Sequence, residues 1–388
     1  MQYFLTWMVG YYACPEASKL PGGFKVMGYV AVRGGTEAIE NSEKLLKYYR
    51  LKGGSPPIQV KQIIDQLRLA VDRVMGEGSL YAPEYAALAI KQAEGDIIEA
   101  SFILRAYRST VPRNHYSLPV DTSNMRIIRR ISAAFKDIPG GQILGPTRDY
   151  TQRLLDFTLE DETPESINKF LSDFLKDLDL DLGGDPSSFP KVVDLLRKEG
   201  LIEERRESST EVVDITKEAM TFPCPRSGRL QAMARGETGG LLALAYSSMR
   251  GYGDIHPTVG ELRVGYVPLT IPHPGGHGEL YVGEILVTEA EVIASFKDKK
   301  GMPKFTIGYG LCFGHNELKA ICMAVLDRTM MAEEPKAPAE DQEFVLYHID
   351  GIESSGFANH YKLPHYITFQ SDLDRLRSSQ KRKEGQGC

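Results

Sequence analysis

The stretch from Gly308 to Met331, GYGLCFGHNELKAICMAVLDRTMM, decides the fold class. Its first half is rich in glycine and strand-forming residues, and its second half predicts a helix with Asn316 at the N-cap. The chain around it mixes helices and strands without the regular alternation of βαβ units. This pattern favours an α+β fold over a doubly wound parallel sheet.

Residues 27–159 predict an N-terminal lobe that is mostly helical. GYVAVR (28–33) is typical of a short strand that closes in a glycine turn. Apolar residues then recur at helical spacing from Val60 to Met75. Pro83 fits the first turn of a second helix, and Asp96 fits the N-cap of a third helix that continues to Tyr107.

Three further segments follow this lobe. Residues 160–210 are acidic and rich in Ser and Gly, with amphipathic pieces at 167–178 and 192–199, and we interpret them as a variable insertion between lobes. Residues 211–334 predict a Gly-rich α+β central domain with helices at 232–246 and 316–331. Residues 335–388 predict an extended C-terminal segment that ends in a frayed polar tail from Lys381.

Composition places few limits on function. The 388 residues carry a formal charge of −6 that is spread along the chain, so neither nucleic acid nor an anionic membrane is indicated as a partner. The spacing of the five cysteines suits neither a disulfide framework nor a zinc knuckle, which indicates reduced thiols. No stretch approaches the roughly 20 apolar residues of a membrane helix. We therefore expect a cytoplasmic protein.

The first 26 residues look only superficially like a signal sequence, because they lack a basic start and a good cleavage context. Gly22-Gly23, a few residues before Met27, is what a translated ribosome-binding tract gives. We expect Met27 to be the initiator and residues 1–26 to be a leader that the native protein lacks.

A cluster of basic residues precedes a glycine turn. In a helix, Arg126, Arg129 and Arg130 would share one face, and Lys136 would extend the positive zone. Guanidinium groups suit phosphate oxygens, and the backbone of Pro139-Gly140-Gly141 leaves room for a ligand to approach closely. The alternative is a solvated basic helix that runs into an ordinary turn, and composition alone favours this alternative.

A second group combines Arg250 with His256 and Glu261. A histidine and a carboxylate five residues apart can supply a general acid and a general base near neutral pH. The alternative, favoured for an isolated motif, is that His256 merely precedes Pro257 in a turn and that Glu261 pairs with Arg263.

Two further motifs are compatible with ligands. The glycine-rich turn at 308–314, directly before a helix, is a ready anion site, but it matches neither a Walker A motif nor a dinucleotide fingerprint. His360 and His365, with Pro364 between them, can grip zinc. Tetrahedral zinc requires more ligands, which would come from water, His348 or another chain. Taken alone, two structural histidines are favoured over two metal ligands.

Seven segments together closely resemble the PhnI family of phosphonate-metabolism proteins. The resemblance runs from Met27 to about Gln370, fades between about 160 and 215, and is absent from both ends. The segments are GYVAVRGGTEAI (28–39), QLRLAVDRVMGEG (66–78), LAIKQAEGDIIEASFILRAYRST (88–110), RRISAAFKDIPGGQILGPTRDYTQRLLDFTL (129–159), LLALAYSSMRGYGDIHPTVGELRVGY (241–266), DQEFVLYHID (341–350) and GFANHYKLPHYITFQ (356–370).

The resemblance implies a subunit of the carbon–phosphorus lyase core complex. Members of this family help to displace the purine base of ATP by a phosphonate, and they release the base from nucleoside triphosphates when their partners are missing. The resemblance also implies partner subunits, among them a radical S-adenosylmethionine iron–sulfur protein, and two copies of the chain in the complex. His360 and His365 match a family metal site at the interface with that partner, which implies zinc shared between chains.

One departure from the family pattern concerns the triphosphate. The pattern has a basic residue before Gly-Tyr-Gly, where this sequence has Ile307, and His315-Asn316 also differs. If that basic residue binds triphosphate, we expect its affinity or the contact with a partner to differ here.

Displacement of adenine passes through an oxocarbenium-like state, so the site must assist the leaving purine and hold the triphosphate. We assign acid–base roles to Asp137, His256 and Glu261. We assign triphosphate binding to the basic residues Arg126, Arg129, Arg130, Lys136 and Arg250. Two other functions stay open. A structural, metal-bridging subunit would release little base, and a free-standing nucleoside triphosphate hydrolase would release phosphate.

Overall fold

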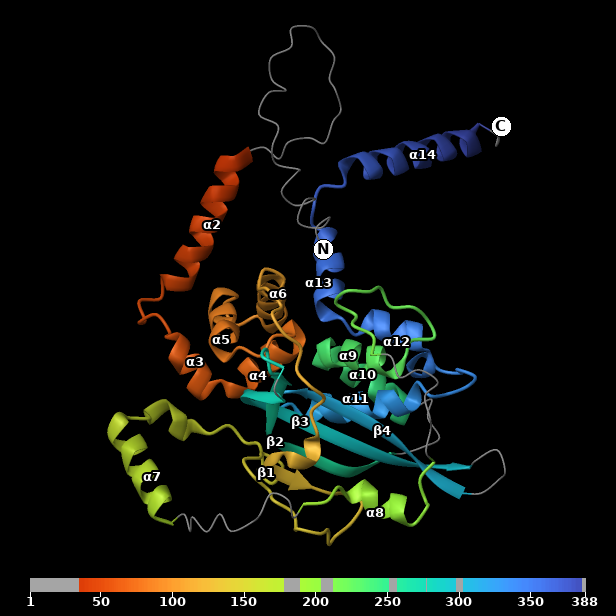
Figure 1. Ribbon diagram of the computed structural model, residues 1–388. Coiled ribbons are helices and arrows are strands. Elements are labelled where there is room, and N and C mark those ends of the chain that lie inside the picture. The colour runs from red at the N-terminus through yellow and green to blue at the C-terminus, as the bar shows by residue number, and fades with distance from the viewer. Residues whose placement is uncertain are drawn as a thin grey trace. The chain divides into compact units, whose positions relative to one another are not determined.

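The computed structural model describes residues 35–177, 189–203, 212–250, 257–276, 278–297 and 303–385 (Figure 1). The predicted leader, the predicted strand at 28–33 and His256 lie outside these ranges. The chain divides into two units. Residues 60–352 form the larger unit, and the segments before 60 and from 353 onward form the smaller one.

Four helices open the larger unit, as predicted for the N-terminal lobe. They are α3 (Val60–Gln66), α4 (Arg68–Gly78), α5 (Pro83–Gln92) and α6 (Ile97–Arg108). Their apolar faces form one buried cluster. Pro83 starts α5, and the carboxyl group of Asp96 accepts hydrogen bonds from two amides at the start of α6. Both predicted helix starts are therefore confirmed.

An antiparallel sheet of four strands, in the order β1-β2-β3-β4, lies at the centre of the larger unit. The strands are β1 (Arg126–Ile131), β2 (Thr258–Pro272), β3 (Glu279–Lys297) and β4 (Pro303–Phe313), and short 3-10 turns occur at Thr122–Asn124 and Phe157–Asp161. The mixture of helices with an antiparallel sheet confirms the α+β class. The helix expected around residues 126–131 is wrong, since these residues form β1.

Helix α11 (Glu317–Thr329) covers one face of the sheet and lies directly against β4. The two backbones approach so closely that a Cβ atom added at Gly308 would lie 1.9 Å from the carbonyl oxygen of Ala324. A Cβ atom added at Gly310 would lie 2.1 Å from the carbonyl oxygen of Ala320. These two glycines therefore serve the packing of the helix on the strand.

The largest apolar cluster lies on the same side as α11. Helices α9 (Arg226–Arg235) and α10 (Thr238–Met249) pack with α11, so the single helix predicted at 232–246 is two helices, interrupted at Gly236. Helix α12 (Gln342–His348) and a 3-10 turn at Pro338–Glu340 contribute to the same cluster.

The opposite face of the sheet is covered in part by α8 (Val192–Lys198), which comes from the predicted insertion. Val193 and Leu196 of α8 are buried against Ile293 of β3. Residues 189–203 thus belong to the packed core, which differs from the interpretation of the whole segment 160–210 as a variable insertion. Helix α7 (Pro164–Asp177) of the same segment is exposed along its described side chains.

A bulge in β2 determines which side chains point to each face of the sheet. Val259 pairs with Val292, and Glu261 pairs with Glu291, so Gly260 is an extra residue without an opposite partner. Because of this extra residue, Val259 and Leu262 both pack on the α11 side. Glu261 points to the opposite face.

The smaller unit contains α2 (Gly35–Leu51), most of α13 (Gly351–His360) and α14 (Tyr366–Glu384). The C-terminal segment, expected to be extended with a frayed tail from Lys381, is therefore helical as far as Glu384. Over the described parts of both units, no helix is both long and apolar enough to cross a membrane.

Candidate functional site

Three of the arginines predicted to bind phosphate, Arg126, Arg129 and Arg130, lie on edge strand β1 and have carboxylate partners. Arg126 is exposed and pairs with Glu284 at 2.8 Å. Arg129 is fully buried and forms ion pairs with Glu317, at 2.8 Å, and with Asp149. Of the three arginines of β1, only Arg126 is open to solvent, whereas Arg129 and Arg130 are buried in ion pairs.

Arg130 and Glu261, to which the sequence assigned different roles, form one buried ion pair. Arg130 Nε donates to Glu261 Oε1 at 2.5 Å, and neither side chain is more than 2% exposed. The remaining guanidinium nitrogens donate to the backbone oxygens of Pro139, Gly141 and Pro190. The predicted glycine turn thus presents carbonyl oxygens to Arg130, which is the opposite of an anion site.

The other predicted residues stand apart from this pair. Lys136 and Asp137 lie in the exposed loop after β1, and Arg250 is exposed at the end of α10. His256 lies outside the described residues. The roles assigned to these four residues stay predictions.

The strand-to-helix turn after β4 already holds a carboxyl group. The His315 amide donates to Asp72 Oδ2 at 3.0 Å. Asn316 occupies the predicted N-cap position, but its side chain makes no capping bond and donates instead to the carbonyls of Asp72 and Phe313. The turn is therefore closed by a side chain of α4, and its glycines are explained without an anion.

His360 and His365 face each other in the smaller unit, with their Nε2 atoms 3.0 Å apart. Two nitrogens at about 2.0–2.1 Å from a tetrahedral zinc ion lie about 3.3 Å apart, so the pair fits a metal. His365 Nδ1 donates to the Leu363 carbonyl at 2.6 Å, which leaves the Nε2 lone pair for a ligand bond. The described residues contain no cluster of three or more potential ligands, so the other ligands would come from water or another chain.

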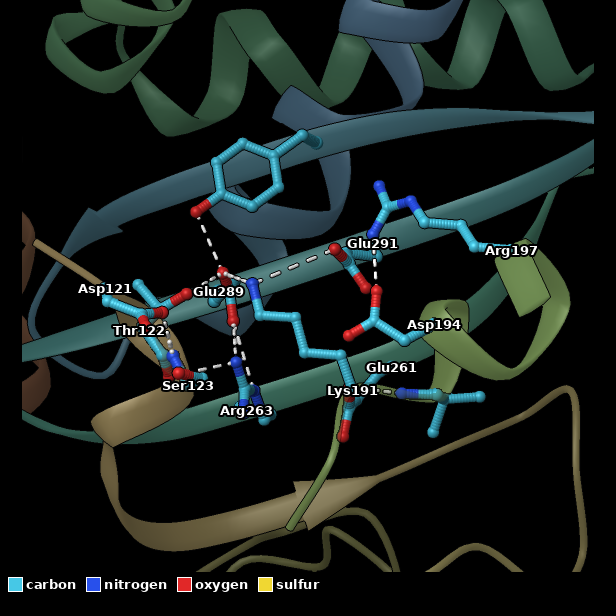
Figure 2. Close-up of polar contacts among 12 residues, drawn as sticks. Asp121, Thr122, Ser123, Lys191, Asp194, Arg197, Glu261, Arg263, Glu289 and Glu291 are labelled. Carbon is cyan, nitrogen blue, oxygen red and sulfur yellow. Dashed lines mark hydrogen bonds and ion pairs between the residues drawn. The ribbon is translucent and has the colours of Figure 1, made fainter. Parts of the chain in front are cut away.

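A buried group of charged side chains, which sequence reasoning missed, lies on the sheet face next to α8 (Figure 2). Glu289 and Glu291 of β3 lie on this face opposite Arg263 and Glu261 of β2. Lys191, just before α8, reaches between the two carboxyls, at 2.8 Å from Glu289 and 4.0 Å from Glu291. The sequence TEAEV (288–292) carried the signal, because acids at i and i+2 of a strand share a face.

Glu289 is an ion whose two oxygens are both satisfied. Its Oε1 accepts hydrogen bonds from Thr122, Lys191 and Tyr309, and its Oε2 accepts from Arg263 at 2.6 Å. Burial by itself would raise the pKa of Glu289, but the charges of Arg263 and Lys191 outweigh burial and lower this pKa to about 2. Glu289 is therefore a carboxylate throughout the neutral range.

Glu291, two residues further on, has the opposite character. Burial raises its pKa to about 7, and the charges of Glu289 and Glu261 add to burial while Lys191 opposes it. Its Oε2 atom is enclosed and has no hydrogen-bond partner among the described residues. A carboxyl group that titrates near neutral pH can donate and accept a proton there.

Glu291 lines a cavity of about 440 Å³ at the β4 edge of the sheet, within the size range of small-molecule sites. Lys191 and Arg226 bring positive charge to it, and Tyr309 brings a hydroxyl group. An apolar wall is formed by Leu230, Ile307 and Met331. In the part of the chain that the structure describes, none of the site residues assigned from the sequence lines this cavity.

Comparison with known proteins now gives the family. The family described as bacterial phosphonate metabolism protein (PhnI) matches residues 28–383. This chain belongs to the PhnI family. The resemblance drawn from seven segments of the sequence is therefore confirmed.

Several relatives of this PhnI protein match it over almost its full length. HtxH of Stutzerimonas stutzeri, whose name contains the words C-P lyase subunit protein, is 54% identical over 93% of this chain and 98% of its own. A protein of Escherichia coli is 48% identical over 91% of this chain and 98% of its own. A protein of Rhizobium meliloti is 48% identical over 90% of this chain and 94% of its own. The last two are both named alpha-D-ribose 1-methylphosphonate 5-triphosphate synthase subunit PhnI.

Proposed function

We propose that this PhnI protein is a subunit of the complex that makes ribose 1-methylphosphonate 5-triphosphate, and that it takes part in displacing adenine from ATP by methylphosphonate. The observation that carries the proposal is 48% identity, over at least nine-tenths of each chain, to two proteins named as subunits of this synthase. When its partners are missing, we expect the chain to release the base as a purine nucleosidase.

The placement of the cations refines the site within this proposal. Arg126, Lys136 and Arg250 are exposed and are the candidates to bind the triphosphate. Arg129 and Arg130 would first have to leave buried ion pairs, which costs several kcal/mol. We therefore assign the triphosphate to the exposed cations and a supporting role to the two buried arginines.

A second candidate function is a structural subunit that bridges partners through a metal. The facing Nε2 atoms of His360 and His365 favour it, because a two-nitrogen site requires ligands from outside these residues to hold zinc. In this function the other ligands belong to another subunit of the carbon–phosphorus lyase complex, such as the radical S-adenosylmethionine iron–sulfur protein. Zinc would supply a cross-link between chains, and two copies of the chain are expected in the complex.

Product chromatography tests the proposal. The purified chain is incubated with ATP, first alone and then with its partner subunits and methylphosphonate, and adenine, ribosyl products and phosphate are separated. We expect adenine in both incubations and the ribosyl phosphonate only with the partners.

Each result assigns the chemistry differently. Adenine that forms only with all partners would make the chain a synthase subunit that depends on assembly. The absence of adenine under both conditions would favour the metal-bridging function. Release of phosphate in place of adenine would indicate a nucleoside triphosphate hydrolase.

A further inference from the structure

We propose that the cavity at the β4 edge binds the purine base of the nucleotide, and that Glu291 donates the proton that the departing base requires. The proposal rests on the proposed function and adds the location of the base and the identity of the acid. It replaces Glu261 in the acid role, because Glu261 is committed to Arg130.

The geometry of Glu291 separates it from the other buried carboxylates of the sheet. Glu261 pairs with Arg130, and Glu289 accepts hydrogen bonds from four residues, so each already has a close cationic partner inside the protein. The Glu291 side chain is 7% exposed and lines the cavity. Its Oε2 atom meets no hydrogen-bond partner within the described residues. Glu291 therefore lines the cavity with a carboxyl group whose nearest cation, Lys191, is 4.0 Å away, so this group is placed to exchange a proton with a ligand.

The lining of the cavity indicates the class of ligand. Leu230, Ile307 and Met331 offer an apolar wall on which a flat ring can lie. The Glu291 carboxyl and the Tyr309 hydroxyl can meet the nitrogens at the edge of such a ring. A purine base has this combination of apolar faces and polar edge, whereas a free phosphonate would leave the apolar wall unused.

The charges around Glu291 keep its proton available near neutral pH. Glu261 and Arg263 face it from β2, Glu289 from β3 and Tyr309 from β4. Lys191 lies 4.0 Å away beside α8, and the remaining charged lining of the cavity comes from Arg197, Glu203 and Arg226. With burial as the largest cause, this surrounding holds the pKa of Glu291 at about 7. A carboxyl group in this range can give up and regain a proton near neutral pH.

The proposed step balances as follows for ATP and methylphosphonate. The bond between ribose C1′ and the base nitrogen breaks, and its electron pair stays on the base. A ring nitrogen of the base takes the proton of Glu291, so adenine leaves as a neutral molecule and Glu291 becomes a carboxylate. An oxygen of the phosphonate dianion donates an electron pair to C1′ and forms the new ester bond. Glu291 regains its proton from solvent before the next turnover.

The first test is the pH profile of adenine release by the full chain with its partner subunits. The wild type is expected to lose activity as the pH rises through about 7, because the acid must be protonated. Glu291→Gln should lower kcat by about 10²–10⁴-fold and remove this falling limb, with little change in KM for ATP. Glu291→Asp, which keeps a titrating carboxyl, should recover part of kcat and keep the limb.

The matched control is Glu279→Gln, on an exposed position of the same strand, which should leave the rate and the profile unchanged. A purely structural role for Glu291 would not give back the falling limb with aspartate. If Glu291→Gln stays within about threefold of the wild type, or keeps the falling limb, the assignment of the acid is wrong.

The second test places the base independently of turnover. Adenine is titrated into the full chain with labelled isoleucine and methionine methyl groups, and ring-current shifts are expected at Ile307 and Met331. No shift at either residue would overturn the location of the base, even if the complex is active. If the complex released no adenine, the proposed function and the role of Glu291 would both fail, whereas shifts at these methyl groups would still support the purine cavity.

Discussion

At the scale of residues, two glutamates on one strand show how surroundings decide chemical character. Glu289 and Glu291 share a sheet face, and both are almost completely buried. The cations Arg263 and Lys191 surround Glu289, and its pKa falls to about 2. Glu291 has fewer partners, and its pKa rises to about 7. Identical side chains two positions apart are therefore suited to different tasks, one as a fixed anion and the other as a proton donor.

The raised pKa of Glu291 predicts a dependence of stability on pH. A carboxyl whose pKa is higher in the folded state stabilises the fold below its unfolded pKa of about 4.5, and this contribution is lost as the pH rises through about 7. Between pH 5 and 8 the wild type should therefore lose on the order of 2 kcal/mol of unfolding free energy that Glu291→Gln does not lose. Urea unfolding at the two pH values measures the difference. Parallel pH dependence of the two proteins would contradict the raised pKa.

The arginines of β1 allow a matched pair of substitutions. Arg130→Ala should lower the unfolding free energy by about 3–5 kcal/mol, because it leaves the buried Glu261 carboxylate without its cation. Arg126→Ala, which removes a surface pair with Glu284, should cost less than about 1 kcal/mol. Thermal or urea unfolding distinguishes the two. Equal losses would show that the Arg130–Glu261 pair is not what stabilises this edge of the sheet.

At the scale of elements, the contact of α11 with β4 depends on two missing side chains. Gly308→Ala would place a Cβ atom 1.9 Å from a backbone oxygen of α11, so the helix must move away from the sheet. We expect a loss of about 3 kcal/mol in unfolding free energy, the upper part of the range for overpacking. Gly53→Ala, where a Cβ atom meets nothing within 4 Å, is the control and should change it by less than about 0.5 kcal/mol. An unchanged melting temperature for Gly308→Ala would contradict the close approach.

Elements fixed by local chemistry could be predicted from the sequence, and those fixed by distant partners could not. Pro83 and Asp96 act within their own helix turns, so both helix starts were predicted correctly. RIIRRI (126–131) has arginines at helical spacing, but its pairing with β2 makes it a strand. The two-residue spacing of Glu289 and Glu291 could have revealed one face of a strand. Lys191, more than ninety residues earlier, could not have been linked to them without the fold.

At the scale of the whole molecule, the chain presents chemistry in each of its two units. The larger unit holds the cavity beside Glu291, and the smaller unit holds the histidine pair. Within the described residues, no third potential ligand lies close enough to His360 and His365 to complete a zinc site. Metal binding by the smaller unit is therefore expected to depend on ligands from another chain.

If the histidine pair binds the metal, removing one of the two histidines should release the metal from the assembled complex. We expect zinc to copurify with the wild-type complex and His365→Ala to remove most of it, since one nitrogen cannot hold the ion as two do. Metal content by mass spectrometry and complex integrity by size-exclusion chromatography measure the effect. His115→Ala, at an exposed position elsewhere, is the control. Full zinc content in the His365 variant would exclude this pair as the metal site.

The bulge at Gly260 changes which residues of β2, odd-numbered or even-numbered, point to a given face of the sheet. On one side of it, odd-numbered residues such as Val259 point toward α11, and beyond it even-numbered residues such as Leu262 do so. Deleting Gly260 would restore a single parity, and a slip of one residue turns every side chain of a strand to the other face. Either Val259 would then point to the charged face, or Glu261 would point to the apolar face that packs on α11. The charged face next to the cavity therefore depends on a residue that has no side chain.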